Sequence, residues 1–338
     1  IINYTNNTTK ETLFYTTSSD PDDPNGMRIE NNGTINVNGY LPINYSSTVL
    51  ANASDHYANR NLGHLFVNNG TINLLNATGY IQDNSGGTYD ASGGGVINAY
   101  NSMALVVNLS VDYSARPYDE EALDDHSILK IGTLNVIGEG VATYGTAVGI
   151  ALRLTEDFSN ATVDISDGVI NVGKYAHGIV IYFEDNQTIN ISTDINASGT
   201  EAIGIITDEF SSTEGMVTNT GNITVNGKDN DGVGPSVGIY IYVDDPFTNK
   251  GNIYAVSSAD NATAKAVGIY VKGTGFIQDG GGTKVISADG TRAVGIYEEI
   301  EKRGGESLII KDTIIKASNS GIGVLSYNDS AIGDPVIT

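Results

Sequence analysis

The apolar stretch AVGIY occurs twice, at Ala266–Tyr270 and at Ala293–Tyr297, 27 residues apart. A second pattern, G-x-I-x-V, alternates with it, as in NNGTINVNG at residues 31–39 and SDGVINVGK at residues 166–174. Recurrence at such a period is typical of a solenoid, in which each repeat stacks on the previous one. The related apolar-Gly-apolar stretches have central glycines that span 323 − 149 = 174 residues in six intervals, a mean of 29, at Gly149, Gly178, Gly204, Gly238, Gly268, Gly295 and Gly323.

Both patterns alternate apolar and polar residues, which is the period of a half-buried strand. In SVGIYIYV, residues 236–243, we therefore expect Val237 and Ile239 to face the interior and Gly238 and Tyr240 to face outward. At about 3.3 Å per strand residue, a coil of this length accommodates three strands and their corners around an apolar interior. The sequence predicts an all-β chain folded as a parallel β-helix with about 29 residues per rung.

A polar residue interrupts one of the apolar positions of this repeat. His177 occupies the place held by Val148, Ile203, Val267 and Val294 in other repeats. We therefore expect it to face the interior as a hydrogen-bonded core histidine, with a pH-sensitive packing defect as the alternative.

Unequal spacing between repeats indicates loop insertions at residues 40–63, 80–93 and 112–127, all within an N-terminal part, residues 1–127. Residues 128–338 are regular, and we expect one continuous solenoid. Long insertions on a rigid scaffold commonly carry binding residues, although they also serve to cover the edges of a solenoid. The candidate contact residues in these insertions are Tyr45, His56, Tyr57, Arg60, Arg116, Tyr118, Asp119 and Glu120.

The composition of the chain disfavours several classes of ligand and environment. The chain has 40 Asp and Glu against 17 Lys and Arg, a net charge of −23, which disfavours nucleic acid as a ligand. It has no cysteine, so disulfides and thiolate metal sites are excluded, and export to an oxidising compartment is compatible with it. No run of 18 apolar residues is present, so we expect no membrane insertion. Because it starts at Ile1 without an initiator Met or a signal peptide, we expect a portion of a longer protein.

An acidic, cysteine-free chain rich in Asn, Thr and Gly, built from GTINV and AVGIY strands, resembles the passenger region of bacterial type V autotransporters of the monomeric kind. The strands look most like those of the large fusobacterial adhesins. The resemblance implies Sec export, a right-handed β-helix on the bacterial surface or released from it, and an outer-membrane β-barrel beyond this sequence. It identifies an architecture more specifically than a function.

Signs of catalysis are weak. No H-x-x-x-H or H-E-x-x-H motif occurs, and we expect no catalytic residue, no cofactor and no metal. His126 follows two aspartates in what we expect to be an exposed charged loop. The β-helical alternative, a polysaccharide lyase or glycoside hydrolase, needs two carboxylates beside a sugar groove. Adjacent carboxylates, expected by chance in so acidic a chain, occur at Asp22–Asp23, Asp124–Asp125, Asp244–Asp245 and Glu298–Glu299.

One group of residues that we expect to face outward is more distinctive than these scattered carboxylates. The position two residues after the repeat glycine is Tyr240, Tyr270 and Tyr297 in three consecutive repeats, with Tyr242 beside them. We expect an exposed aromatic ladder suited to protein or sugar recognition, or else one that only stabilises stacking. The predicted function is a monomeric adhesin segment that binds a host or bacterial surface protein or glycan, and the further alternative is a passive stalk.

Overall fold

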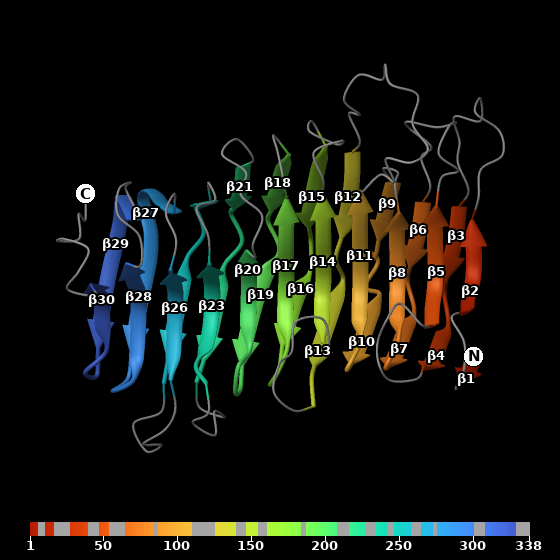
Figure 1. The fold of residues 1–338 in the computed structure, drawn as a ribbon, viewed down its shortest axis with the longest axis horizontal. Coiled ribbons are helices and arrows are strands. Elements are labelled where there is room, and N and C mark those ends of the chain that lie inside the picture. Colours follow the sequence, from red (N-terminus) through yellow and green to blue (C-terminus); the bar gives the residue numbers. More distant parts are fainter. Residues whose placement is uncertain are drawn as a thin grey trace.

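The computed structural model describes residues 1–5, 11–16, 28–39, 47–53, 65–83, 87–109, 126–139, 147–154, 161–183, 187–207, 216–227, 234–242, 247–257, 265–272, 276–300 and 308–328. These residues form 30 β-strands and no helix. The strands stand side by side in a row, with β1 and β30 at its opposite ends (Figure 1). Nothing in the described part of the chain is a helix of the length and apolarity needed to cross a membrane.

All strand pairs are parallel, and the strands form one 19-stranded and one 11-stranded sheet. The 11-stranded sheet contains β2 (Glu11–Thr16), β5 (Ser47–Ala53), β8 (Thr78–Asp83), β11 (Met103–Leu109), β14 (Val148–Leu154), β17 (His177–Phe183), β20 (Ile203–Thr207), β23 (Ser236–Ile241), β26 (Ala266–Val271), β28 (Ala293–Ile300) and β30 (Ile322–Asn328). It is the sheet of the apolar-Gly-apolar repeat.

The 19-stranded sheet contains two columns of strands. The G-x-I-x-V column comprises β1 (Ile2–Thr5), β4 (Thr34–Asn38), β7 (Thr71–Leu75), β10 (Val96–Tyr100), β13 (Thr133–Ile137), β16 (Val169–Val172), β19 (Asp194–Ser198), β22 (Ile223–Asn226) and β25 (Ile253–Val256). The other comprises β3 (Arg28–Asn31), β6 (Leu65–Asn68), β9 (Gly87–Asp90), β12 (His126–Lys130), β15 (Thr162–Ser166), β18 (Thr188–Ile191), β21 (Met216–Asn219) and β24 (Phe247–Asn249). The long strands β27 (Phe276–Asp289) and β29 (Leu308–Ser318) continue both columns.

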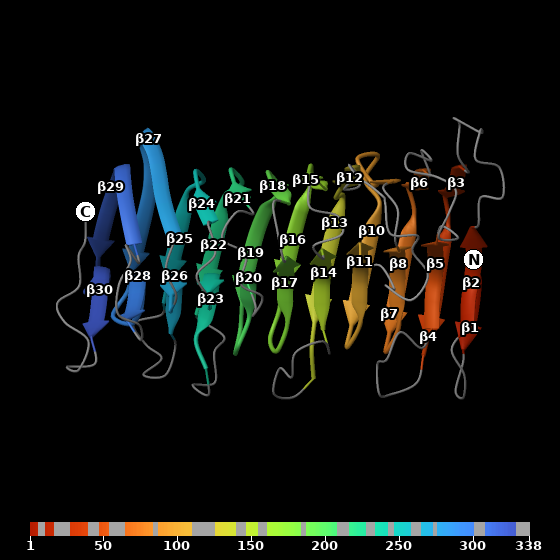
Figure 2. The ribbon, with the colours of Figure 1, turned by 45° about the horizontal axis from the view of Figure 1, so that its top comes forward.

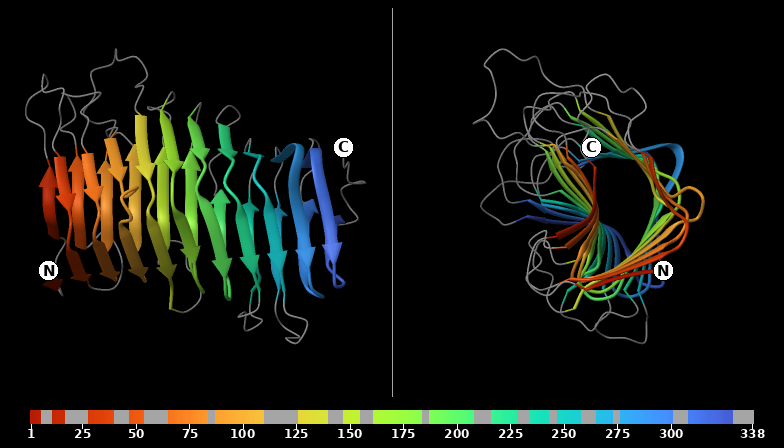
Figure 3. Two further views of the ribbon diagram at one scale, coloured as in Figure 1. Left: turned by 180° about the vertical axis from the view of Figure 1, so that it is seen from behind. Right: turned by 90° about the vertical axis from the view of Figure 1, so that its right-hand side faces the viewer.

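Each coil therefore supplies one strand to each of three columns, and the chain winds around a common interior (Figure 2; Figure 3, right). The prediction of a parallel β-helix is confirmed. The AVGIY repeat has the expected cause, because Ala266 pairs with Ala293 and Ile269 with Ile296 on the next coil.

The interior is built from ladders of like residues. The isoleucine of G-x-I-x-V is replaced only once along nine coils, and all nine side chains are at most 4% exposed: Ile35, Ile72, Ile97, Leu134, Ile170, Ile195, Ile223, Ile253 and Ile286. Burying each such side chain contributes about 1.5–3 kcal/mol. The same type of residue therefore recurs at this position of the repeat because every coil has the same interior space to fill.

Asparagine side chains form a matching ladder on the outside of the same strands. Each amide donates to the side-chain oxygen of the preceding coil at 2.7 to 3.0 Å, in the order Asn3, Asn36, Asn73, Asn98, Asn135, Asn171 and Asn196. This row of hydrogen bonds holds successive coils in register along the solenoid.

The repeat glycine faces the interior, which corrects the prediction that it faces outward. A Cβ added to Gly268 would lie 2.8 Å from Ile253 Cγ2, inside the core, and 2.5 Å from the oxygen of Gly295. Ile269 is also buried. Two consecutive residues thus point inward, and strict alternation fails because a residue without a side chain lets the strand approach the opposite sheet.

The residues before the glycine consequently lie on the outer face. Val148 belongs to a second apolar cluster, separate from the interior, and Val237, Val267 and Val294 share its place in the strand register. The interior position predicted for these valines is wrong. The same correction applies to His177, which pairs in register with Val148 and is 5% exposed on that outer face.

The interval 80–93 is not an insertion. Its residues form part of β8 and all of β9, and Tyr80 and Tyr89 are buried in the core, each at 2% exposure, in contact with Phe66. Within residues 40–63 the structure describes β5, and within 112–127 only the start of β12. Residues 45, 56, 57, 60, 116 and 118–120, which include every candidate contact residue of the loops, lie outside the described residues.

Candidate binding groove

An apolar stripe runs along the outer face of the 11-stranded sheet. It consists of two parallel columns of side chains, which we call the outer stripe. One column is Met103, Val148, His177, Ile203, Val237, Val267, Val294 and Ile322. The other is Ile81, Val106, Ala151, Val180, Ile206, Tyr240, Tyr270, Tyr297 and Leu325.

Burial changes along this stripe. Val148 is 2% exposed and Ile206 is 2% exposed, whereas Ile322 and Leu325 at the C-terminal end are 42% and 37% exposed. Val267 and Val294 are half-buried. Most side chains of the outer stripe are thus buried or half-buried, and its last two, Ile322 and Leu325, are exposed.

The four predicted tyrosines come together where the stripe becomes accessible. The rings of Tyr240 and Tyr270 are 4.7 Å apart between centroids and inclined by 19°, and those of Tyr270 and Tyr297 are 4.9 Å apart and inclined by 40°. Tyr242 stacks beside Tyr240 at 6.2 Å, and the ammonium of Lys272 lies 5.4 Å from the centre of the Tyr242 ring. Because Tyr270 has a tyrosine on each side, its ring edge, rather than its faces, is available to a ligand.

The hydroxyl groups of Tyr270 and Tyr297 remain protonated. Tyr270 donates a hydrogen bond to the Glu299 carboxylate. Burial first, and then Glu299, raise the pKa of Tyr270 well above its usual range, and burial and Glu299 also raise the pKa of Tyr297. Both side chains therefore present neutral hydroxyl groups at physiological pH.

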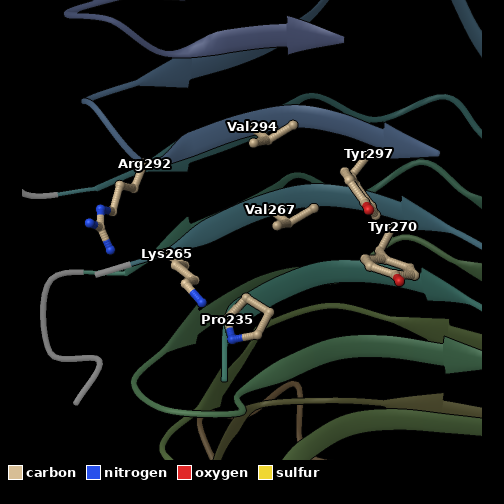
Figure 4. Close-up of a pocket in the computed structure, with 7 residues that line it drawn as sticks. All are labelled: Pro235, Lys265, Val267, Tyr270, Arg292, Val294 and Tyr297. Atoms are coloured by element: carbon tan, nitrogen blue, oxygen red, sulfur yellow. The ribbon is translucent and has the colours of Figure 1, made fainter. Parts of the chain in front are cut away.

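A groove of about 480 Å³ lies between the tyrosines and the start of their strands. It is lined by Pro235, Lys265, Val267, Tyr270, Arg292, Val294 and Tyr297, and we call it the Val–Tyr groove. Figure 4 shows the two valines at its centre, the tyrosines on one side, and Lys265 and Arg292 on the other. This volume is within the range of about 300–1,000 Å³ that ligand sites occupy.

The coil repeat places the cationic side chains of Lys265 and Arg292 on adjacent coils. The backbone N–H of Ser236 donates to the oxygen of Lys265, and that of Ala266 donates to the oxygen of Arg292, each at 3.1 Å. Pro235, Lys265 and Arg292 thus occupy the same position on three successive coils. Both cationic side chains are exposed, and within the described residues no carboxylate pairs with either of them.

The sequence pattern predicts the tyrosines but not the rest of the groove. A signal was present, because each groove residue holds a fixed place relative to the repeat, as in K-A-V-G-I-Y and R-A-V-G-I-Y. Strict alternation predicts that the valines face the interior, so it does not indicate that the positions beside them form one outer surface.

Of the four adjacent carboxylate pairs, the structure describes only Glu298 and Glu299, and these two side chains have different hydrogen-bond partners. Glu298 faces the interior with 0% exposure and accepts a hydrogen bond from Ser326 at 2.7 Å, whereas Glu299 accepts from Tyr270. His126 lies in β12, not in a loop, and its Nε2 is 2.7 Å from Asp164 Oδ2 on the exposed surface. Among the described residues no three His, Asp or Glu side chains gather in a way that could hold a metal ion.

Comparisons with known proteins give little further information. No protein-family model and no curated protein matches the sequence. One solved structure is similar, a crystal structure of a TibC-catalysed hyper-glycosylated fragment of TibA, at 13% identity with a TM-score of 0.18, covering 98% of this chain and 99% of that one. A likeness at this TM-score carries no argument about the present chain.

Proposed function

We propose that this chain is a surface-exposed passenger segment of a monomeric bacterial autotransporter, of the fusobacterial adhesin type, and that it binds a surface protein or glycan of a host cell or another bacterium. The resemblance of the GTINV and AVGIY strands supports the autotransporter assignment, and the β-helix is compatible with it. The segment acts as a monomer outside the cell, by binding and not by catalysis.

The observation that carries the binding role is the opening of the outer stripe at the Val–Tyr groove. In the same column Val148 and Val237 are buried, whereas Val267 and Val294 are half-buried and line the groove beside two tyrosines. Tyr and Arg are enriched among residues that dominate binding energies. An apolar surface left open on a rigid scaffold is typical of an interaction site.

The test is binding of the purified chain, immobilised on beads, to epithelial cells and to bacterial cells. We expect saturable binding that is lost in Val294→Glu, which places a charge in the groove. The matched control is Thr283→Glu, which adds the same charge at an exposed position of β27 in the other sheet. Equal binding by the two variants, or no binding by the unmodified chain, would contradict the adhesin role of this face.

The tyrosine ladder gives a second candidate, a passive stalk. Because Tyr270 packs between Tyr240 and Tyr297, the ladder also stabilises the stacking of coils. Absence of cell binding by the unmodified chain supports the stalk. The enzymatic alternative, a lyase or glycosidase, predicts that the chain releases reducing ends from a panel of polysaccharides. We expect no such release.

A further inference from the structure

Two like charges stand on adjacent coils at one edge of the Val–Tyr groove. Equivalent positions on stacked coils are about 4.8 Å apart along the backbone, so Lys265 and Arg292 repel one another. In a chain of net charge −23, acids are available to compensate such a pair, yet no described carboxylate does so. This edge is thus complementary to an anionic group of a ligand.

The remainder of the groove is apolar. Val267 and Val294 form its centre and Tyr270 and Tyr297 its opposite wall (Figure 4). Apart from the two cations, the hydroxyl groups of the tyrosines are the polar side-chain groups of the lining, and that of Tyr270 is already bonded to Glu299.

This chemistry disfavours a sugar as occupant. An oligosaccharide site requires polar side chains for its hydroxyl groups and an aromatic face against which a ring can lie. The Val–Tyr groove has valines where such polar groups would stand, and the rings of Tyr240, Tyr270 and Tyr297 pack against one another. Apolar side chains of a polypeptide, by contrast, gain free energy by covering these valines.

We infer that the Val–Tyr groove binds a segment of a protein partner in which apolar residues are flanked by Asp or Glu. The apolar side chains cover Val267 and Val294 against the tyrosine wall, and the carboxylates pair with Lys265 and Arg292. This inference rests on the proposed adhesin function and narrows its partner to a protein with an acidic, apolar segment.

The test is selection of a phage library of random twelve-residue peptides on the folded chain, beside an array of sialylated and uronate-containing oligosaccharides. We expect enriched peptides that combine Asp or Glu with large apolar residues. Their dissociation constants should rise about tenfold in Lys265→Ser/Arg292→Ser. The matched control, Lys311→Ser/Lys316→Ser, removes the same charge from exposed positions of β29 and should bind as the unmodified chain does.

Several results would overturn the inference: no enrichment, enriched peptides without acidic residues, equal affinity for the two double variants, or array binding that depends on Lys265 and Arg292. Cell adhesion separates this failure from that of the proposed function. If cells bind the unmodified chain and Lys265→Ser/Arg292→Ser equally well, the adhesin role stands and the acidic-segment inference fails. If no cell binds the unmodified chain, the adhesin role itself fails.

Discussion

Replacing the inward glycine of one coil by alanine tests how closely the coils stack. In Gly268→Ala the new methyl group would lie 2.5 Å from the backbone oxygen of Gly295 and 2.8 Å from Ile253 Cγ2. Both distances are shorter than a normal van der Waals contact. The first contact is with backbone of the next coil, so it cannot be relieved by a side-chain rotation alone.

The expected loss of stability in Gly268→Ala is the sum of three contributions to the free energy of unfolding. Overpacking of a tight interior costs about 1–3 kcal/mol, and displacement of the coil weakens one or two ladder hydrogen bonds worth about 1 kcal/mol each. Replacing glycine restricts the unfolded chain, which offsets about 0.4–1 kcal/mol. We therefore expect the free energy of unfolding of Gly268→Ala to fall by about 1–4 kcal/mol.

The assay is urea unfolding followed by circular dichroism, with Gly33→Ala as control. Gly33 has no atom within 4 Å of an added Cβ and lacks a positive φ, so its replacement should be neutral or slightly stabilising. An unchanged urea midpoint for Gly268→Ala, or an equal loss in Gly33→Ala, would refute the inward placement of the repeat glycine.

Three further predictions concern the interior, the buried tyrosine and the asparagine ladder. Thr207 is buried between Ile181 and Ile241, and its hydroxyl has no hydrogen-bond partner among the described residues, so Thr207→Val should raise the free energy of unfolding by about 1–2 kcal/mol in urea titrations. Burial raises the pKa of Tyr89 far above its ordinary value, although Asn68 donates a hydrogen bond to its oxygen. The stability that Tyr89 contributes is therefore complete below about pH 10, where unfolded tyrosine ionises, and decreases as the pH rises beyond it. Urea midpoints of Tyr89→Phe should depend less on alkaline pH than those of the unmodified chain, and equal slopes would contradict this. Asn135 bonds to Asn98 and Asn171, whereas Asn196 bonds only to Asn171 within the described part of the chain, so Asn135→Ala should cost about 1–2 kcal/mol and Asn196→Ala about half of that. Equal losses would show that the ladder does not act through these bonds.

The fold was predictable because the period is visible in the sequence. AVGIY and GTINV mark two strands of each coil, and the third is harder to recognise since β24 has only three residues, Phe247–Asn249. The pattern predicts an insertion at residues 80–93 because Gly87–Asp90 lacks the apolar alternation of a strand, although its tyrosine fills the core.

The tyrosines of the groove were predictable from the sequence, but the two valines at its centre were not. Alternation placed Tyr240, Tyr270 and Tyr297 outward correctly, two residues after the glycine. The same rule assigned Val267 to the interior, because it cannot anticipate that a glycine and the following isoleucine both face inward. Whether an outward valine is accessible depends on what covers it, and a single sequence does not encode that in a local pattern.

Stacking of successive coils in register is the claim on which the groove depends, and engineered cysteine pairs test it most directly because the chain has no cysteine. Asn98 and Asn135 are register partners, so their Cα atoms should lie about 4.8 Å apart, within the range of about 4.4–6.8 Å for disulfides. Asn98 and Asn171 are two coils apart, at about 9.6 Å. We predict that mild oxidation links Asn98→Cys to Asn135→Cys within one chain, as measured by intact mass and loss of free thiol, and leaves Asn98→Cys/Asn171→Cys reduced. Failure of the first pair to close, or equal closure of the second, would contradict the stacked solenoid.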